Sequence, residues 1–375
     1  RTAYGGWIGV PMKKKFKFLI ILCLLALFFS VSACSKKNGE GQQDTGAALE
    51  EKAESKSEDT KEEETVDDSL FKKTVVKIGK EEVSYSEAMI YFQYIKDKYE
   101  TYFGDQIWDY EFEGQTFGEM AKQEIMDMIA QTKIAGAQAE NYNIEITEED
   151  EAQIRENAQK LMDNITQEDK DRFGLTQEIV EKFYRDNMLY EKVYDASTMN
   201  VDTDVSDEEA KQITIDQIFI SAAKTDTDGK KIAISGEEKE KAYKKAKELL
   251  KEAKKADNFY KFAEANTQDS RVEYTFGRGD MDEAVEDAAF ALKTGEISNI
   301  VETEDGYYIL YCVSDYNEDA TLEKKEEIIA ERQNNTFKKL YTQWASDTKV
   351  SVNEKIWDEL KLENDSKDNT EETTE

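Results

Sequence analysis

The stretch FGRGDMDEAVEDAAFALKTGEISNIVETEDGYYILYCV, residues 276–313, decides how the second half of this chain folds. Its first part has the pattern of a short helix. Its second part predicts two short strands joined by a tight turn at Asp305 and Gly306. Tyr308 stands just after that turn. A bulky phenol at this place, in a chain without any histidine, raises the question of whether it takes part in chemistry.

The hairpin closes a longer unit, residues 213–315, whose pattern predicts a compact α+β domain. The unit opens with the strand-like run ITIDQIFIS, and Ser235 then begins an S-x-x-E capping box for a helix over 237–254. Asp257 is the predicted cap of a shorter second helix, and Gly295 is the predicted end of a third. The predicted order of elements is therefore β-α-α-(β)-α-β-β.

Helical patterns lie on both sides of this unit. In residues 71–200, apolar side chains such as Phe92 and Ile95 recur at spacings of three and four, and Thr147 is a good helix cap. Residues 320–360 carry a second amphipathic pattern, which cannot remain exposed along its apolar side. We expect that C-terminal segment to pack back onto the first. The predicted fold class is α+β, with the α+β unit inserted in an all-helical lobe.

The chain begins with features of a targeting signal. Residues 12–33 have a basic start, a short apolar run and small residues before Cys34, which is the secretory pattern. The ending VSAC resembles a bacterial lipobox and predicts lipidation of Cys34. A plain anchor helix and ordinary secretion are the alternatives. Residues 1–11 precede the basic start of the signal, and we interpret them as an upstream over-extension of the reading frame. The composition of residues 34–70 and 361–375 predicts acidic, disordered segments.

Composition excludes several classes of function. The formal net charge of −33 argues against nucleic-acid binding, which needs basic side chains, and against electrostatic docking to anionic lipid. Without histidine, the chain lacks the usual acid–base group at neutral pH and the commonest metal ligand. We expect no metal site and no cofactor. Cys312 has no partner for an internal disulfide once the signal is cleaved and Cys34 carries lipid, so we predict a core residue.

The run from Phe276 to Gly306 resembles the second half of a parvulin-type peptidyl-prolyl isomerase domain. From residue 12 to about 360, the chain is similar to the PrsA-type extracytoplasmic foldases and the related SurA-type chaperones. The resemblance implies an isomerase domain at 213–315 and a helical lobe that holds unfolded or newly secreted polypeptides. It also implies a lipid anchor at the extracytoplasmic face of a bacterial cell membrane, and a homodimer formed through the helical lobe.

The resemblance assigns residues to the proline-binding surface. Met281 and Phe290 match its apolar walls, Phe276 lies at the start of the same motif, and Val285 stands where the family has a phenylalanine. These four side chains are the predicted substrate-binding residues. Ordinary core packing is the alternative role for Met281 and Phe290.

Four polar residues match the central positions of the family's site. Asp269 in TQDS falls on its central polar position, and Thr303 falls on a polar position before the last turn. Gln217 and Tyr308 stand where the family carries its two histidines. Asp269 as a helix-end cap and Gln217 as partner of a buried backbone group are the structural alternatives.

Three hypotheses follow for the function. The first is a working isomerase in which Gln217 and Tyr308 replace the paired imidazoles as hydrogen-bonding groups. Rotation about one amide bond needs no covalent intermediate, so it does not require histidine. The second is a lipoprotein holdase whose parvulin-like unit is weak or inactive. The third is a lipid-anchored ligand-binding or adhesion protein.

Overall fold

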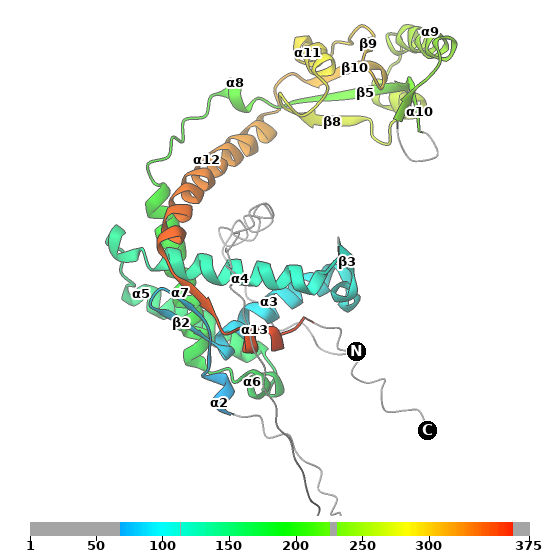
Figure 1. Cartoon of the computed structure of the whole chain (residues 1–375). Helices are drawn as coiled ribbons and strands as arrows, with labels where there is room; N and C mark the ends of the chain where they lie inside the picture. Colours follow the sequence, from blue (N-terminus) through cyan, green and yellow to red (C-terminus); the bar gives the residue numbers. More distant parts are fainter. Residues whose placement is uncertain (1–67, 113, 226–230, 363–375) are drawn as a thin grey trace, which may run out of the picture. The chain divides into compact units, whose positions relative to one another are not determined.

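The computed structural model describes residues 68–112, 114–225 and 231–362. The predicted signal, Cys34 and most of both acidic segments lie outside these described residues. The chain divides into two compact units, of which one runs to Met199 and resumes at Phe337, and the other is Asn200–Thr336 (Figure 1). Among the described residues, no helix has both the length and the apolar character needed to cross a bilayer.

The first unit is the helical lobe. Its described elements are α2 (Asp68–Phe71), β1 (Thr74–Ile78), β2 (Glu81–Ser84), α3 (Tyr85–Phe103), η1 (Asp105–Asp109), β3 (Glu111–Phe112), β4 (Gln115–Thr116), α4 (Phe117–Gly136), η2 (Ala139–Tyr142), α5 (Glu148–Asn164), α6 (Gln167–Phe173), α7 (Gln177–Thr198), β11 (Val350–Val352) and α13 (Glu354–Glu359). The long helix α12 (Glu318–Asp347) begins in the second unit and ends in this one.

Local capping explains where the helices of the lobe begin. The hydroxyl of Thr147 accepts a hydrogen bond from the backbone N–H of Asp150, and the carboxylate of Asp150 accepts one from the backbone N–H of Thr147. The predicted cap at Thr147 is therefore confirmed, as part of a capping box. Thr116 makes the same box at the start of α4. Thr166 caps the short helix α6, which the apolar spacing alone did not predict.

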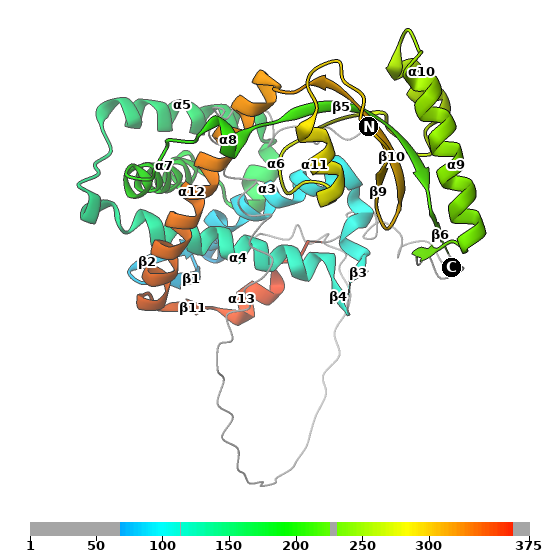
Figure 2. The ribbon, with the colours of Figure 1, turned by 90° about the horizontal axis from the view of Figure 1, so that it is seen from above.

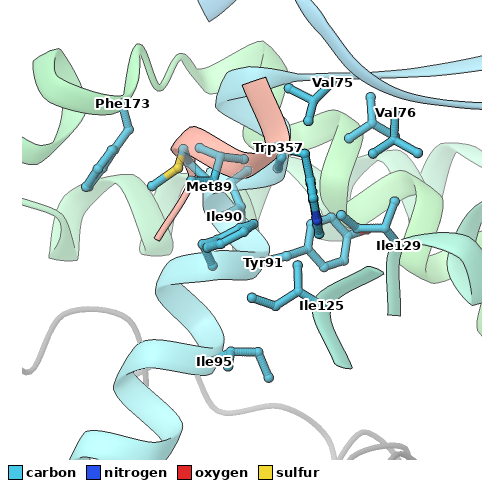
Figure 3. Packing of buried hydrophobic residues seen from close by; sticks show 14 of the residues in the cluster. Val75, Val76, Met89, Ile90, Tyr91, Ile95, Ile125, Ile129, Phe173 and Trp357 are labelled. Carbon is cyan, nitrogen blue, oxygen red and sulfur yellow. The ribbon is translucent and has the colours of Figure 1, made fainter. Parts of the chain in front are cut away.

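The two ends of the lobe close around one hydrophobic core. Strand β11 pairs with β1 in antiparallel register, with Val352 opposite Val76. Trp357 of α13 meets Phe92 of α3 edge to face, with ring centroids 5.4 Å apart, within the apolar packing drawn in Figure 3. The C-terminal segment therefore packs onto the N-terminal one, as the sequence predicts. A small sheet, in the order β11-β1-β2, is an addition to the predicted helices.

Four charged side chains lie between α3, α4 and α7, and we call them the lobe charge cluster: Glu87, Lys133, Lys182 and Asp186. Lys133 is buried and donates to Glu87 at 2.5 Å and to Asp186. Lys182 donates to both oxygens of Glu87 at 3.1 Å and to Asp186 at 3.0 Å. Burial alone would lower the pKa of Lys182, but the two carboxylates outweigh it and raise that pKa.

The second unit contains the predicted α+β domain. Its elements are α8 (Asp207–Ala210), β5 (Ile213–Ser221), β6 (Ala223–Thr225), β7 (Lys231–Ala233), α9 (Gly236–Ala253), α10 (Phe259–Asn266), β8 (Glu273–Phe276), α11 (Glu283–Ala291), β9 (Val301–Glu302) and β10 (Gly306–Ser314). Four strands form an antiparallel sheet in the order β8-β5-β10-β9. The predicted order of elements is confirmed, and the small β6–β7 hairpin is an addition.

The predicted start of one helix and the predicted end of another were wrong by one to a few residues. The cap of α10 is Asn258, whose side chain accepts a hydrogen bond from the backbone of Lys261 at 2.8 Å; Asp257 lies one residue too early. Helix α11 ends at Ala291, because Leu292 already has extended backbone. Gly295 instead turns the chain toward β10 with a φ of 90° and donates to the carbonyl of Cys312 at 2.8 Å.

Candidate active site

The sheet of the second unit has two different faces. Strands β5 and β10 pass between α11 on one side and α9 with α10 on the other (Figure 2). Because side chains alternate along a strand, residues 213, 215, 217 and 219 of β5 share one face. Ile213 and Ile215 pack there with Val285 and Ala289 of α11. We call this α11 side of the sheet the site face.

Strand register brings side chains of three strands together on the site face. Tyr308 of β10 lies opposite Phe219 of β5, and Leu310 lies opposite Gln217. On the other side of β5, Tyr274 of β8 lies opposite Ile215. Gln217, Tyr308 and Tyr274 are therefore neighbours on one surface although 91 residues separate the first from the second.

The loop between α10 and β8 runs beside β5 and fixes the position of Asp269. Thr267 accepts hydrogen bonds from the backbone of Phe219 at 3.0 Å and of Asp269 at 3.2 Å. The backbone of Gln268 donates to the carbonyl of Phe219, and that of Gln217 donates to Val272, both at 2.9 Å. The loop is thus hydrogen-bonded along β5 in the way that a neighbouring strand would be, and this places Asp269 next to Gln217.

Asp269 accepts two side-chain hydrogen bonds on one carboxylate oxygen. Gln217 Nε2 donates to Oδ2 at 2.8 Å, and the hydroxyl of Tyr274 donates to the same oxygen at 2.9 Å. The backbone of Ser270 donates to Oδ1 at 2.6 Å. We call Gln217, Asp269 and Tyr274 the Asp269 cluster. Gln217 and Asp269 are two of the predicted site residues, and the structure joins them by a direct hydrogen bond.

One polar atom of the Gln217 side chain makes no hydrogen bond to another described residue. This side chain is 1 % exposed, and its Oε1 has no hydrogen-bond partner among the described residues. The amide orientation follows from Asp269, since a carboxylate can accept from the amide nitrogen but not from its oxygen. A buried acceptor without a donor is unfavourable by about 1–3 kcal/mol. Among the described residues, Gln217 is thus bonded to the cluster through its amide nitrogen only.

Tyr274 is a site residue that the sequence did not reveal. Its neighbours in the sequence read as an ordinary strand, and only the register with Ile215 places it on the site face. Burial raises the pKa of its hydroxyl, and the hydrogen bond to Asp269 raises it further, so it remains a donor at neutral pH. The guanidinium of Arg271 lies over its ring, 4.6 Å from the centroid.

Tyr308 contributes to the site face through its ring. The ring packs on Phe219, with centroids 4.7 Å apart. Burial, followed by the charges of Asp305, Asp269 and Asp282, raises the pKa of Tyr308 to about 12. Its hydroxyl makes no hydrogen bond to another of the described residues. Tyr308 is thus close to the Asp269 cluster without being bonded to it, and it cannot act as a base near neutral pH.

Thr303 lies away from the cluster and closes the β9–β10 turn. Its backbone donates to the carbonyl of Gly306 at 2.9 Å, and its hydroxyl lies 3.3 Å from the backbone nitrogen of Gly306. Gly306 is required here, because a Cβ atom would fall 2.2 Å from the carbonyl oxygen of Ile220. The turn contacts of Thr303 support a structural role in placing Tyr308.

The predicted apolar residues gather near α11. Met281 and Phe290 are partly buried, whereas Phe276 and Val285 are buried in the same apolar cluster. Phe290 packs on Phe276 with centroids 6.2 Å apart, and Arg278 lies 4.3 Å above its ring. Met281 and Phe290 therefore keep surface that a ligand can contact, while Val285 is part of the interior.

Glu286 of α11 holds the loop that carries Met281. Its carboxylate accepts hydrogen bonds from the backbone of Gly279 at 2.7 Å and of Met281 at 2.9 Å, and the side chain is buried. The backbone of Gly277 donates to Asp280 at 2.8 Å within the same loop. The position of Met281 is thus set by charge-assisted hydrogen bonds and not by apolar contact alone.

The opposite face of β5 carries a second buried carboxyl group. Asp216 is 4 % exposed, and its Oδ1 has no hydrogen-bond partner among the described residues. It lies across from Glu273 of β8. Burial, and then the charge of Glu273, raise the pKa of Asp216 to about 6. Alternation along the strand keeps this group on the face away from Gln217.

The site face combines an apolar surface with one hydrogen-bonded carboxylate. Such a surface can bind an apolar ring and orient polar groups beside it. Cys312 is buried, and burial raises its pKa, so it is not an activated thiol. Within residues 68–112, 114–225 and 231–362, no group of three metal-binding side chains is arranged to hold an ion.

The second unit is similar to a known domain family. Residues 218–314 match the family model described as "Rotamase: PPIC-type PPIASE domain". "Foldase protein PrsA" of Clostridium botulinum (strain Okra / Type B1) is 23 % identical over 375 residues, covering 92 % of this chain and 99 % of the relative. The same-named protein of Caldanaerobacter subterraneus is 24 % identical over 248 residues, covering 63 % of this chain and 72 % of the relative. The predicted resemblance to parvulin-type isomerases and PrsA-type foldases is confirmed.

The matches among solved structures have low TM-scores. PrsA of Lactococcus lactis covers 76 % of this chain and 96 % of its own, at 18 % identity and a TM-score of 0.32. A SurA-like chaperone of Campylobacter jejuni covers 74 % of this chain and 98 % of its own, at 11 % identity and a TM-score of 0.28.

Proposed function

We propose that this chain is a membrane-anchored extracytoplasmic foldase that assists secreted proteins and isomerises prolyl bonds through its parvulin-type domain. One observation carries the catalytic part of the proposal. Asp269 accepts hydrogen bonds from Gln217 and Tyr274 on the same face of the domain that presents Met281 and Phe290. Polar groups thus stand beside an apolar surface, within a domain that matches the isomerase family.

The reaction needs only preferential stabilisation of a twisted amide. Resonance opposes rotation of a peptide bond with a barrier of about 18–20 kcal/mol. In the proposed mechanism, Met281 and Phe290 bind the prolyl ring and keep water away from the amide. The Asp269 cluster interacts more strongly with the twisted state than with the planar one, which lowers the barrier. No covalent bond is made or broken, and no group has to exchange a proton.

Asp269 and Tyr274 are half-buried and keep exposed surface, whereas Gln217 is buried, so we place the contact with an extended client on Asp269 and Tyr274. A client backbone N–H, directly or through a water molecule, would donate to the carboxylate of Asp269. Gln217 would hold that carboxylate in place through the hydrogen bond from its Nε2. In this proposal, Tyr308 provides packing and Thr303 shapes the turn that positions it.

A prolyl-peptide isomerisation assay on the whole chain tests the catalytic part. We expect a rate above the uncatalysed one, and a fall of about tenfold or more in kcat/KM for Asp269→Ala, as for other positioned polar groups. Glu248→Ala, an exposed carboxylate on α9, is the matched control and keeps the full rate. A natural chain that does not exceed the uncatalysed rate would show that the isomerase proposal is wrong.

A lipid anchor at Cys34 places the foldase at the extracytoplasmic membrane face in this proposal. The support is the lipobox-like VSAC ending in the sequence. The test is fractionation of producing cells with natural Cys34 and with Cys34→Ala. We expect the natural chain in the membrane fraction and the variant in the soluble one; equal membrane retention of both would contradict the anchor.

A holdase without isomerase activity is the second candidate. The observation that favours it is the replacement of both family histidines, by a glutamine bonded to Asp269 and by a tyrosine whose hydroxyl has no partner among the described residues. The double variant Gln217→Ala/Asp269→Ala separates the two functions. If it suppresses aggregation of an unfolded test protein as well as the natural chain does, holding of clients is independent of catalysis.

A further inference from the structure

Exposed aromatic side chains gather at one place in the helical lobe. Ten large hydrophobic side chains are exposed among the described residues, and four of them fall within residues 102–112. These four, which we call the aromatic tip, are Tyr102, Phe103, Tyr110 and Phe112, with exposed fractions from 56 % to 79 %. Single exposed apolar residues are normal, but a group of this kind marks a contact site.

The aromatic tip stands on a fixed support. It spans the end of α3, the turn η1 and the strand β3, next to the first residues of α4 (Figure 1). Beneath it, Tyr99 meets Trp108 and Phe117 edge to face, with centroids 6.1 and 4.8 Å apart. Phe103 stacks on Tyr99 at 6.5 Å. One of the four exposed rings, that of Phe103, is therefore held directly by an interior aromatic cluster.

Backbone and polar contacts hold the same segment in place. Trp108 Nε1 donates to the carboxylate of Glu100 at 2.7 Å. The backbone of Phe117 donates to the carbonyl of Tyr110 at 2.7 Å, and Phe112 pairs with Gln115 in the β3–β4 hairpin. The tip rings are thus exposed on an ordered local structure. Covering each ring by a partner would be favourable by about 1.5–3 kcal/mol.

The charge around the tip indicates what kind of partner fits. Residues 96–122 contain seven acidic and three basic side chains, and Lys98, one of the basic ones, lies 4.7 Å from the ring centroid of Tyr99. The surroundings of the tip are therefore acidic in balance. A partner that covers the rings therefore meets a negative surface, which favours lysine and arginine and repels acids. A second copy of this chain carries the same net charge of −33, and an anionic bilayer is negative as well. An unfolded polypeptide segment with apolar and basic residues matches both features.

We propose that the aromatic tip is a binding site for extended, basic and apolar segments of unfolded polypeptides, and that it does not need proline. Aromatic rings contribute large contact area at small entropic cost, and they bind cationic side chains through their faces. The site extends the proposed foldase function, because it lies in the helical lobe and works without the Asp269 cluster.

Binding of labelled peptides to the whole chain tests this site. One probe is a short fluorescent peptide of lysine, phenylalanine, leucine and serine without proline; the other has glutamate in place of each lysine. We expect the natural chain to bind the basic probe about tenfold more tightly at low salt, with the difference shrinking as salt screens the charges. Because neither probe contains proline, this result does not depend on isomerase activity.

Two variants locate the binding on the tip. Tyr102→Ser/Phe103→Ser/Tyr110→Ser/Phe112→Ser removes the four rings, and we expect it to weaken the basic probe by about tenfold or more. Met199→Ser/Tyr260→Ser/Leu322→Ser removes exposed apolar side chains elsewhere and is expected to bind within about twofold of the natural chain. Both should isomerise a prolyl peptide at the natural rate, which separates this proposal from the proposed function.

A charge variant keeps the test decisive if the ring variant does not fold. Glu111→Lys lies on the exposed strand β3 and leaves the interior aromatic cluster untouched. We expect it to weaken the basic probe and to strengthen the acidic one. Unchanged binding in both the ring variant and the charge variant would overturn the proposal. So would equal affinity of the natural chain for the two probes, or a tip variant that only converts a dimer into a monomer.

Discussion

The lobe charge cluster and the Asp269 cluster are both polar groups enclosed by apolar side chains, but they are completed differently. In the lobe, two ammonium groups and two carboxylates join α3, α4 and α7, and each lysine contacts both acids. On the site face, one carboxylate is held by neutral donors, and Gln217 keeps an acceptor without a partner among the described residues.

The difference agrees with a structural role for the lobe charge cluster and with the binding role that we propose for the Asp269 cluster. In a cluster of paired charges, every charged group already has a partner within the protein. Removing one of them is expected to lower the free energy of unfolding. A carboxylate that is held by neutral donors and keeps exposed surface, as Asp269 does, can still accept a hydrogen bond from a bound peptide. The two units thus differ in how completely their polar groups are paired within the described residues.

Removing Lys133 is expected to have the largest effect. Lys133→Met leaves the carboxylate of Glu87 buried with only the half-exposed Lys182 to contact it, so the free energy of unfolding should fall by about 3–5 kcal/mol. Urea unfolding measures the change. Lys182→Met, whose side chain is 39 % exposed, is the control and should lose about 1 kcal/mol or less.

The double variant Glu87→Leu/Lys133→Met should recover most of that loss, because no buried charge remains unpaired. A loss for Lys133→Met that is no larger than the control's would show that the lobe cluster is not essential to the fold.

Asp216 tests whether an incomplete polar group is by itself a mark of function. Its pKa of about 6 in the folded protein lies above the ordinary carboxyl value, so folding favours the protonated form. Stability should therefore fall as pH rises from about 4 to about 6, by roughly 2–3 kcal/mol in total. Asp216→Asn should stabilise the protein by about that amount near pH 7 and change little near pH 4, as measured by urea unfolding.

Isomerase activity should be unchanged in Asp216→Asn, because the side chain lies on the face away from the site. If Asp216→Asn changed stability equally at both pH values, folding would not raise the pKa of Asp216. Lost activity would mean that the two faces of β5 are coupled.

Tyr274→Phe removes one of the two side-chain donors to Oδ2 of Asp269. We expect kcat/KM for a prolyl peptide to fall by about tenfold, which corresponds to about 1.4 kcal/mol and to one hydrogen bond to a charged group. Stability should change by less than about 1 kcal/mol, because the ring still packs on the site face. Tyr260→Phe, an exposed tyrosine on α10, is the matched control. Full activity in Tyr274→Phe would reduce the cluster to Gln217 and Asp269.

The smallest effect is expected at Tyr308. Tyr308→Phe should keep kcat/KM within about twofold, because the hydroxyl makes no hydrogen bond that the ring depends on. Tyr308→Ala should lose more, since the ring packs 4.7 Å from that of Phe219. With a pKa of about 12, Tyr308 should add no pH dependence to the rate near neutral pH. A large loss for the phenylalanine variant would instead assign the hydroxyl to the reaction.

Local signals in the sequence predicted the elements of the fold, and they failed where distant residues decide. Thr147 and Ser235 identify helix starts because a cap and its partner are three residues apart. Asp257 and Asn258 are equally good caps by type, and only the hydrogen bond to Lys261 distinguishes them. The split lobe was predictable because an amphipathic helix such as α12 needs a surface to cover.

The polar clusters show more clearly which contacts a local sequence pattern cannot predict. Glu87 near a helix start and Lys133 within a helix both look like surface residues in the sequence, because charges on helices usually face solvent. Their pairing joins residues 46 positions apart, and no local pattern carries that information. Tyr274 was missed for the same reason, since its role depends on strand register, whereas Asp269 and Gln217 were found through the family resemblance.

The pairing of β11 with β1 has a consequence for the timing of folding. Val76 meets its partner Val352 only after the entire inserted domain has been synthesised. At about 5–20 residues per second, that delay is roughly 14–55 s. The inserted domain ends with β10 at Ser314, so it can be complete during the last 38 residues of this interval, about 2–8 s, while the edge of β1 that faces β11 is still unpaired. The two halves of the lobe are thus expected to join after the inserted domain has folded.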